Sequence, residues 1–243
     1  MRLDLNWRTE DGLRLPMALW HPGPGYRMIS SGVLGGGLGP REWVLNAQVP
    51  AGYGRKDPAA HLRELAGGLG LHRPGIGLLT AAQVTDVVQR QDEGVQAAAT
   101  VGLRVPTWAA ARSVGADPEL APIDRELPAR PGTINVIVSM PVALSDAALV
   151  NAVVTATEAK VQAVLDAGFP GTGTATDAIC IAAIADPGGA PIEAFTGPRS
   201  LWGARIARAV HAAVRAGAAA YAATLTARQL RTLARARSPR RPG

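Results

Sequence analysis

Cysteine and aromatic residues are scarce in this sequence. It has one cysteine, Cys180, which excludes a disulfide framework, and its place in an apolar strand predicts an unreactive core residue. Aromatic residues make up only 4% of the chain, which argues against nucleic-acid binding by base stacking. The four histidines are scattered and none has metal-ligand spacing with another, which argues against a zinc hydrolase. We therefore expect neither a metal site nor a cofactor.

Acidic residues are absent from the C-terminal tail, residues 226–243, although this tail carries six arginines. The net charge of +6 is thus a property of the tail, because the remaining chain is close to neutral. A basic tail is not the basic face of a nucleic-acid-binding domain. The sequence also lacks a signal-peptide hydrophobic region and any uninterrupted run of about 18 apolar residues. We expect a cytoplasmic protein with neither a nucleic-acid nor a membrane partner.

A length of 243 residues with 47% apolar residues is enough for a full hydrophobic core. We predict a single domain over residues 1–225, followed by the tail. Many short strands with a few helices among them favour an α+β fold, a layered sandwich of mixed or antiparallel sheets with buried helices. The regular alternation of a doubly wound sheet is not seen.

The individual elements follow from apolar periodicity, turn residues and helix caps. Helices are expected at 57–68, with Asp57 as N-cap and Pro58 in the first turn, at 145–168, and from about residue 200. Two hairpins are expected, one between 84–90 and 95–103 across a turn at 92–94, and one between 178–185 and 192–196 across a turn at 186–189. Extended segments are expected at 2–7, 17–20, 26–34, 43–49, 75–81, 84–90, 95–103, 133–140, 178–185 and 192–196.

Two stretches of the chain resemble each other weakly. A duplication about a pseudo-twofold axis and a chance likeness between segments rich in small residues both remain open. A duplication predicts that the two asparagine-bearing strands lie side by side and that polar residues of both halves converge. The matching residues are Asn46 with Asn135, Thr80 with Thr176, and Asp86 with Asp177.

A run of glycines, which includes Gly35, Gly36 and Gly37, ends a hydrophobic strand. Consecutive backbone N–H groups in such a run can bind an anion or stabilise an oxyanion. The spacing matches neither a dinucleotide fingerprint nor a P-loop. The alternative to a ligand contact is a bulge and tight turn at the end of the strand.

The helix expected at 145–168 carries Glu158 and Lys160 within two apolar stripes, so we expect it to be buried on two sides. The two charges are two positions apart and cannot pair with each other. Each needs an outside partner, such as Asp177, Asp86 or a substrate. A buried lysine can act in proton transfer, and the alternative is a structural salt bridge.

Polar residues at the ends of two predicted strands are further candidates. Thr133 and Asn135 stand at the start of one strand, and an asparagine side chain can hydrogen-bond an amide. A hydroxyl-rich loop with Thr174 and Thr176 delivers Asp177 to the start of the next. Such an aspartate can activate water or a threonine nucleophile, or it can cap its own backbone.

Several short motifs then occur in one order. They resemble the adenosylcobinamide amidohydrolase family over roughly residues 28–215. The resemblance implies a hydrolase of corrinoid salvage that cleaves the amide joining aminopropanol to the corrin, so that adenosylcobinamide yields adenosylcobyric acid. Cobalt then enters only as part of the corrinoid substrate. The motifs lie at residues 31–37, 46–50, 53 with 57–58, 77–82, 99–103, 131–135, 155–160 and 173–177.

For this reaction we expect Asp177 to activate water, and Lys160 to protonate the leaving amine or hold the oxyanion. Asn135, Thr133 or the glycine N–H groups complete the oxyanion site. The candidate catalytic residues are Asp177, Lys160, Glu158, Asn135 and Thr133. The candidate substrate-binding residues are Gly35, Gly36, Gly37, Asn46, Tyr53, Thr80, Asp86, Thr174 and Thr176.

Two other functions remain open. One is a corrinoid-binding protein without catalysis, and the other is an amidase whose threonine nucleophile is released by self-cleavage before Thr133 or Thr174. A homodimer is also an open expectation. We further expect Trp43, Tyr53 and Trp202 to cover the adenosyl group or the ring faces.

Overall fold

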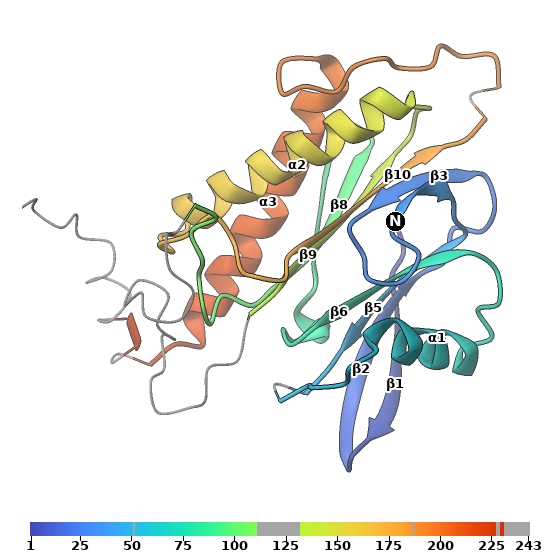
Figure 1. The fold of residues 1–243 in the computed structure, drawn as a ribbon. Helices are drawn as coiled ribbons and strands as arrows, with labels where there is room; N and C mark the ends of the chain where they lie inside the picture. The colour runs from blue at the N-terminus through green and yellow to red at the C-terminus, as the bar shows by residue number, and fades with distance from the viewer. Residues whose placement is uncertain (51, 111–131, 187, 227–228, 231–243) are drawn as a thin grey trace, which may run out of the picture.

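The computed structural model describes residues 1–50, 52–110, 132–186, 188–226 and 229–230. Two β-sheets stack on each other (Figure 1). The smaller sheet has the order β1 (Asp4–Glu10), β2 (Leu13–Trp20), β5 (Trp43–Gln48), β6 (Gly75–Thr80). The larger has the order β4 (Gly37–Pro40), β3 (Tyr26–Ser30), β10 (Ala178–Ile184), β9 (Ile134–Met140), β8 (Val95–Val101), β7 (Val88–Asp92).

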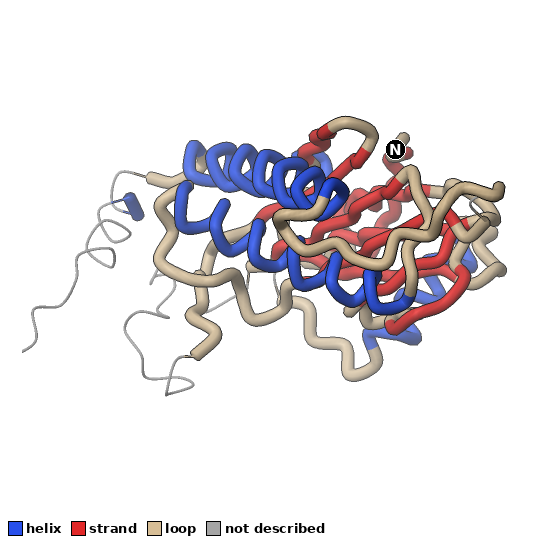
Figure 2. Tube along the Cα trace, turned by 90° about the horizontal axis from the view of Figure 1, so that it is seen from above, coloured by secondary structure: helices blue, strands red, loops and turns tan. Residues whose placement is uncertain are grey.

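Three helices cover the outer faces of the two sheets. Helix α1 (Pro58–Gly68) joins the parallel strands β5 and β6 and packs on the smaller sheet. Helix α2 (Asp146–Asp166) joins the parallel strands β9 and β10 and lies with α3 (Leu201–Ala223) against the larger sheet. Figure 2 shows α2 and α3 side by side over the strands. The layers are therefore helix, sheet, sheet, helix pair, and the predicted α+β sandwich is confirmed.

Local sequence signals account for the starts of the helices. Asp57 accepts a hydrogen bond from the Ala60 N–H at 2.8 Å, and Pro58 is the first helical residue. Ser145 and Ser200 cap α2 and α3 in the same way. These three predicted helix starts are confirmed. Most of the C-terminal tail, residues 226–243, lies outside the described residues.

The hairpin predicted between 178–185 and 192–196 is wrong. Strand β10 pairs with β3 on one side and with β9 on the other, so neither of its edges is free for a hairpin partner. In segment 192–196, Glu193 forms a single β-bridge with Leu144. Residues 84–90 are also not one extended segment, because a 3₁₀ turn, η1 (Val84–Asp86), precedes β7.

The sequence analysis predicted that helix α2 is buried on two sides, and this prediction is wrong. One face packs against α3 and β10, but Val150, Val154 and Leu165 are 53%, 48% and 42% exposed on the other. Among the described helices, α2 is the one long and apolar enough to cross a membrane by length and composition, and half of the relevant window is buried inside the protein. Such burial is typical of a helix that covers a sheet.

The internal duplication stays a prediction. Each sheet contains a strand–helix–parallel strand unit, β5–α1–β6 and β9–α2–β10. However, Thr80 ends β6, whereas Thr176 and Asp177 precede β10. The matched residues Thr80 and Thr176 therefore do not occupy matching places in the two units.

The glycine run forms a loop that crosses from one sheet to the other. Strands β3 and β4 pair in the larger sheet, and between them Leu34 forms an antiparallel bridge with Gly77 of the smaller sheet. Gly35 has φ +65°, and a Cβ there would collide with the carbonyl oxygen of Gly75. The backbones can approach this closely only without a side chain. This loop therefore connects the two sheets beside strand β6.

The difference between Gly35 and Gly37 predicts unequal effects of the same substitution. Both have positive φ, but a Cβ on Gly37 meets nothing within 4 Å. Gly37→Ala should lower the free energy of unfolding by about 1–2 kcal/mol, the cost of a left-handed alanine. Gly35→Ala should cost clearly more because of the added collision. Thermal unfolding measures both, at about 2–4 °C per kcal/mol for a chain of this size. Equal shifts in Tm would contradict the bridging role of the loop.

Candidate active site

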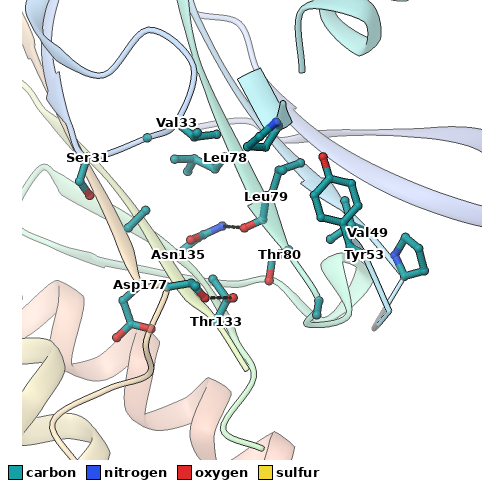
Figure 3. Close-up of a pocket in the computed structure, with 16 residues that line it drawn as sticks. Ser31, Val33, Val49, Tyr53, Leu78, Leu79, Thr80, Thr133, Asn135 and Asp177 are labelled. Atoms are coloured by element: carbon teal, nitrogen blue, oxygen red, sulfur yellow. Dashed lines mark hydrogen bonds between the residues drawn. The ribbon is translucent and has the colours of Figure 1, made fainter. Parts of the chain in front are cut away.

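A cavity of about 480 Å³ lies where strands of the two sheets end. Its wall residues come from the loop after β3, from the loop between β5 and α1 with the first residue of α1, from the end of β6, and from the chain around the starts of β9 and β10 (Figure 3). Sequence segments more than 100 residues apart thus meet at one place. The lining residues are Ser31, Gly32, Val33, Val49, Pro50, Tyr53, Pro58, Leu78, Leu79, Thr80, Ala81, Thr133, Asn135, Thr176, Asp177 and Ala178.

Two buried asparagines, one from each sheet, join the sheets beside this cavity. Asn135 Nδ2 donates to Asn46 Oδ1 and to the Leu79 carbonyl oxygen, both at 2.9 Å. Asn46 Nδ2 donates in turn to Thr100 Oγ1 at 3.0 Å. The Leu79 carbonyl can only accept, so it fixes which end of the Asn135 amide faces it. The predicted convergence of Asn46 and Asn135 is therefore confirmed.

This network leaves one polar atom of Asn135 without a partner. Asn135 is 1% exposed and lines the cavity, yet its Oδ1 accepts no hydrogen bond among the described residues. A buried acceptor without a donor costs free energy, so the atom is suited to receive an N–H or O–H from a ligand. Both amide hydrogens of Asn135 are already used, so the predicted role as oxyanion donor does not fit this geometry.

Lys160 forms a buried ion pair with Asp177, which is part of the cavity lining. Lys160 Nζ lies 2.6 Å from Asp177 Oδ2, and the two side chains are 9% and 11% exposed. Thr174 N also donates to Oδ2, while Thr174 Oγ1 and the Ile134 N–H donate to Oδ1. Asp177 is thus the partner of Lys160, one of the partners that the sequence predicted.

Four donors use the full accepting capacity of the Asp177 carboxylate. No lone pair remains to take a proton from water, so this geometry does not fit the predicted role as base. The backbone of Gly173 also covers the pair, because a Cβ there would collide with Lys160 Nζ and Asp177 Oδ2. Lys160 does not line the cavity. The ion pair braces the start of β10, and through Ile134 the start of β9.

Three predicted threonines lie at or next to the cavity. Thr133 Oγ1 and Thr176 Oγ1 are 2.7 Å apart, and Thr176 Oγ1 also donates to the Gly132 carbonyl oxygen. The hydrogen between the two hydroxyls therefore belongs to Thr133. Thr80 Oγ1 accepts from the Ala82 N–H at 3.0 Å. Thr174 holds Asp177 instead of lining the cavity.

Tyr53 stands across the cavity from Asn135 (Figure 3). Its hydroxyl lies 3.0 Å from Nδ1 of His61, and Nε2 of His61 lies 3.3 Å from Glu10 Oε1. Burial lowers the pKa of His61, and the Glu10 carboxylate offsets only part of this effect. Burial acts to raise the pKa of Glu10, but the hydrogen bond from Arg8 and nearby positive charges bring that pKa below its usual value.

Several predicted site residues lie away from the cavity. Glu158 is exposed on α2, because a separation of two residues turns it away from Lys160. Asp86 is exposed at the end of η1 and lines a neighbouring cavity of about 330 Å³. The run Gly35, Gly36, Gly37 lies in the turn before and at the start of β4, outside the cavity lining. Burial raises the pKa of Cys180 to about 12, which agrees with an unreactive core thiol.

Comparison with known proteins agrees with the ordered motifs. The model of a protein family described as adenosylcobinamide amidohydrolase (CbiZ) matches residues 4–226. The chain belongs to this family. An adenosylcobinamide amidohydrolase of Methanosarcina mazei is 32% identical over 157 residues, 65% of this chain and 69% of the relative. One of Halobacterium salinarum is 39% identical over 123 residues, 50% of this chain and 49% of the relative. The chain is thus a hydrolase, an adenosylcobinamide amidohydrolase of corrinoid salvage.

Three residues at or behind this cavity were missed by the sequence analysis. Ser31 is exposed in the cavity lining, and its Oγ accepts the Ile179 N–H at 3.2 Å. His61 and Glu10 stand behind Tyr53. The available signal was a histidine next to Leu62 on the buried face of α1. Among the described residues, no three His, Cys, Asp or Glu side chains lie close enough to hold a metal ion.

The ion pair predicts strong coupling between Lys160 and Asp177. Lys160→Met or Asp177→Asn alone should lower the free energy of unfolding by about 3–5 kcal/mol, because each leaves its buried partner uncompensated. The double variant should cost much less than the sum of the two single changes. Denaturant unfolding of the four proteins measures this coupling. Strictly additive costs would show that the two charges do not depend on each other.

Proposed function

We propose that the amide of adenosylcobinamide is hydrolysed in this cavity, with Asn135 Oδ1 accepting the N–H of the scissile amide. One observation carries the assignment: a buried amide oxygen, held in place by three other polar groups, lacks a donor at the wall of a cavity. The link between aminopropanol and the corrin is a secondary amide, which offers one N–H donor and one carbonyl acceptor. Such a group fills the open position of Asn135.

The size of the cavity sets which part of the substrate enters. Pockets that enclose drug-sized ligands span about 300–1,000 Å³, and this cavity of about 480 Å³ lies within that range. A corrinoid is far larger than such a ligand. The aminopropanol arm therefore enters, while the ring rests on the rim, where Val33 is 49% exposed. This cavity is too small for the whole ring.

Only one of the three aromatic residues expected at the ring lines the cavity. Trp43 is buried against α1, and Trp202 lies on α3 beneath Arg205. Tyr53 is part of the wall. The hydroxyls of Ser31 and Thr80 each accept a backbone N–H, and each keeps its own hydrogen for donation. Either hydroxyl can therefore donate to the carbonyl oxygen of the substrate amide, where negative charge develops during attack.

In this proposal the Lys160–Asp177 pair has a positioning role. Asp177 Oδ1 accepts the Ile134 N–H at 2.9 Å, directly beside Thr133 and Asn135 in the chain. The pair therefore acts on the substrate through the strand that carries Asn135. The homodimer and the cytoplasmic location expected from the sequence stay predictions. The exposed residues Val150, Val154 and Leu165 mark a face whose substitution would test the dimer.

Replacing Asn135 with alanine tests the proposed contact. Loss of one hydrogen bond to the substrate should lower kcat/KM about 10- to 100-fold, because such bonds are worth about 1–3 kcal/mol when their partner stays buried. Hydrolysis of adenosylcobinamide, followed by chromatography of adenosylcobyric acid, measures the effect. An ester analogue, in which oxygen replaces the N–H, should be cleaved with similar kcat/KM by the variant and the wild-type enzyme.

Asn46→Ala is the matched control. It removes the same hydrogen bond between the two asparagines but leaves Asn135 Oδ1 in place, together with the hydrogen bond from Asn135 Nδ2 to the Leu79 carbonyl oxygen. We expect a loss of stability with kcat/KM for the amide within a few-fold of the wild-type value. Equal loss of kcat/KM in both variants, on amide and ester alike, would contradict a direct contact between Asn135 and the substrate.

A further inference from the structure

Amide hydrolysis needs a group that takes a proton from water, and the cavity wall offers few candidates. Among the described lining residues, the titratable side chains are those of Tyr53 and Asp177. The Asp177 carboxylate already accepts four hydrogen bonds. The hydroxyls of Ser31, Thr80 and Thr133 have no basic side chain among their hydrogen-bond partners. Tyr53 differs from all of these, because a histidine and a glutamate stand behind it.

The Tyr53–His61–Glu10 chain has a defined direction of hydrogen bonding. Glu10 is ionised, and its Oε1 lies 3.3 Å from His61 Nε2, so the neutral imidazole carries its hydrogen on the nitrogen that faces this carboxylate. His61 Nδ1 then holds a lone pair and accepts the hydrogen of the Tyr53 hydroxyl. The phenolic oxygen keeps its own lone pairs for a donor from the cavity. Glu10 thus orients the imidazole as a carboxylate does in a catalytic triad.

Burial and packing hold the three groups in place. His61 is 2% exposed on the inner face of α1, and its ring stacks on Tyr53 with 5.6 Å between centroids. The Glu10 side chain is 11% exposed at the end of β1. The end of strand β1 and the buried face of helix α1 thus meet behind Tyr53.

Two neighbouring arginines favour the ionised form of Glu10. Arg8 donates to Glu10 Oε2 and to the Gln48 carbonyl oxygen, and Arg55 donates to Glu10 Oε1. Two further carboxylates belong to the surroundings of this cluster. Asp57 acts to raise the pKa of Tyr53, and Glu64 acts to raise that of His61 and accepts a hydrogen bond from Arg55. The charged and titratable groups that face the relay are Arg8, Glu10, Arg55, Asp57 and Glu64.

We infer that Tyr53, backed by His61 and Glu10, is the proton-transfer group of the hydrolysis. This inference rests on the proposed function, because it needs the scissile amide to lie in this cavity. Tyr53 is a catalytic residue in this assignment, since its oxygen contacts the attacking water. His61 and Glu10 are positioning residues that act through Tyr53.

The proton movements balance in two steps. In the first, a water molecule gives a proton to the Tyr53 oxygen, the original hydroxyl proton of Tyr53 passes to His61 Nδ1, and the water oxygen bonds to the amide carbon. The imidazolium that forms lies beside the Glu10 carboxylate. In the second, the carbon–nitrogen bond breaks while Tyr53 protonates the leaving nitrogen and His61 returns its proton to Tyr53. The products are a carboxylic acid and an amine, and all side chains regain their starting state.

Tyr53→Phe is the main test, because it removes the hydroxyl and keeps the ring. We expect kcat to fall about 10²- to 10⁴-fold, the usual contribution of general acid–base catalysis, with KM within a few-fold. His61→Gln should give a similar loss, and the double variant should be no worse than either single variant, because the two act as one unit. Tyr26→Phe, on β3 and outside the cavity lining, is the matched control and should keep wild-type kcat.

The pH profile of Glu10→Gln separates a relay from mere support of the loop. His61 must be neutral to accept a proton, so kcat/KM should fall as the pH drops through the pKa of His61. Burial places that pKa below the usual imidazole value, and the Glu10 charge opposes the decrease. Removing this charge should therefore move the acid limb of the profile to lower pH, in addition to lowering the plateau.

The outcomes distinguish failure of the relay from failure of the proposed site. Wild-type kcat in folded Tyr53→Phe, with Asn135→Ala impaired, would overturn the relay and keep the cavity as the active site. Wild-type turnover in both variants would overturn the proposed site and the relay together. An acid limb that does not move in Glu10→Gln would also overturn the relay, because a purely structural role changes only the plateau.

Discussion

The hydrogen bond between Asn46 and Asn135 is the interaction on which the site depends. Each amide is buried among apolar side chains, where a polar group without a partner is costly, so the two sheets reach their lowest free energy when the asparagines meet. This requirement sets the position of the smaller sheet over the larger one. It also consumes both amide hydrogens of Asn135 and leaves one oxygen at the cavity wall. The contact that joins the sheets thus creates the acceptor for the substrate.

The charged groups on both sides of the cavity are held in ion pairs. The Lys160–Asp177 pair braces the start of β10, and the Glu10 cluster stands behind Tyr53. The scissile amide is neutral, and an unpaired ion facing it would have to lose its water when the ligand fills the cavity, which costs several kcal/mol. Neutral hydroxyl and amide groups avoid that cost. The ion pairs fix the orientation of these groups through hydrogen bonds.

Features that depend on neighbours in the chain were predictable from the sequence. The helix starts follow from their N-cap residues, Asp57, Ser145 and Ser200. The apolar runs around Asn46 and Asn135 indicate buried strands that each contain a polar residue. Contacts between distant segments were not. Glu10 and His61 are separated by 51 positions in two elements that each read as ordinary surface or helix sequence. Likewise, β10 pairs with β3 and β9, and the sequence of β10 alone does not indicate which strands lie beside it.

The choice of a tyrosine as the reacting group follows from the same constraint. A histidine placed directly at the wall would need its own hydrogen-bond partner in the apolar cavity, and its protonated form would face the neutral substrate. With His61 buried behind the phenol, the imidazolium that forms during the reaction lies next to Glu10 and away from the substrate. The group that touches water remains uncharged before and after the transfer. The positive charge that develops on His61 is therefore stabilised by the Glu10 carboxylate, on the side of the imidazole away from the substrate.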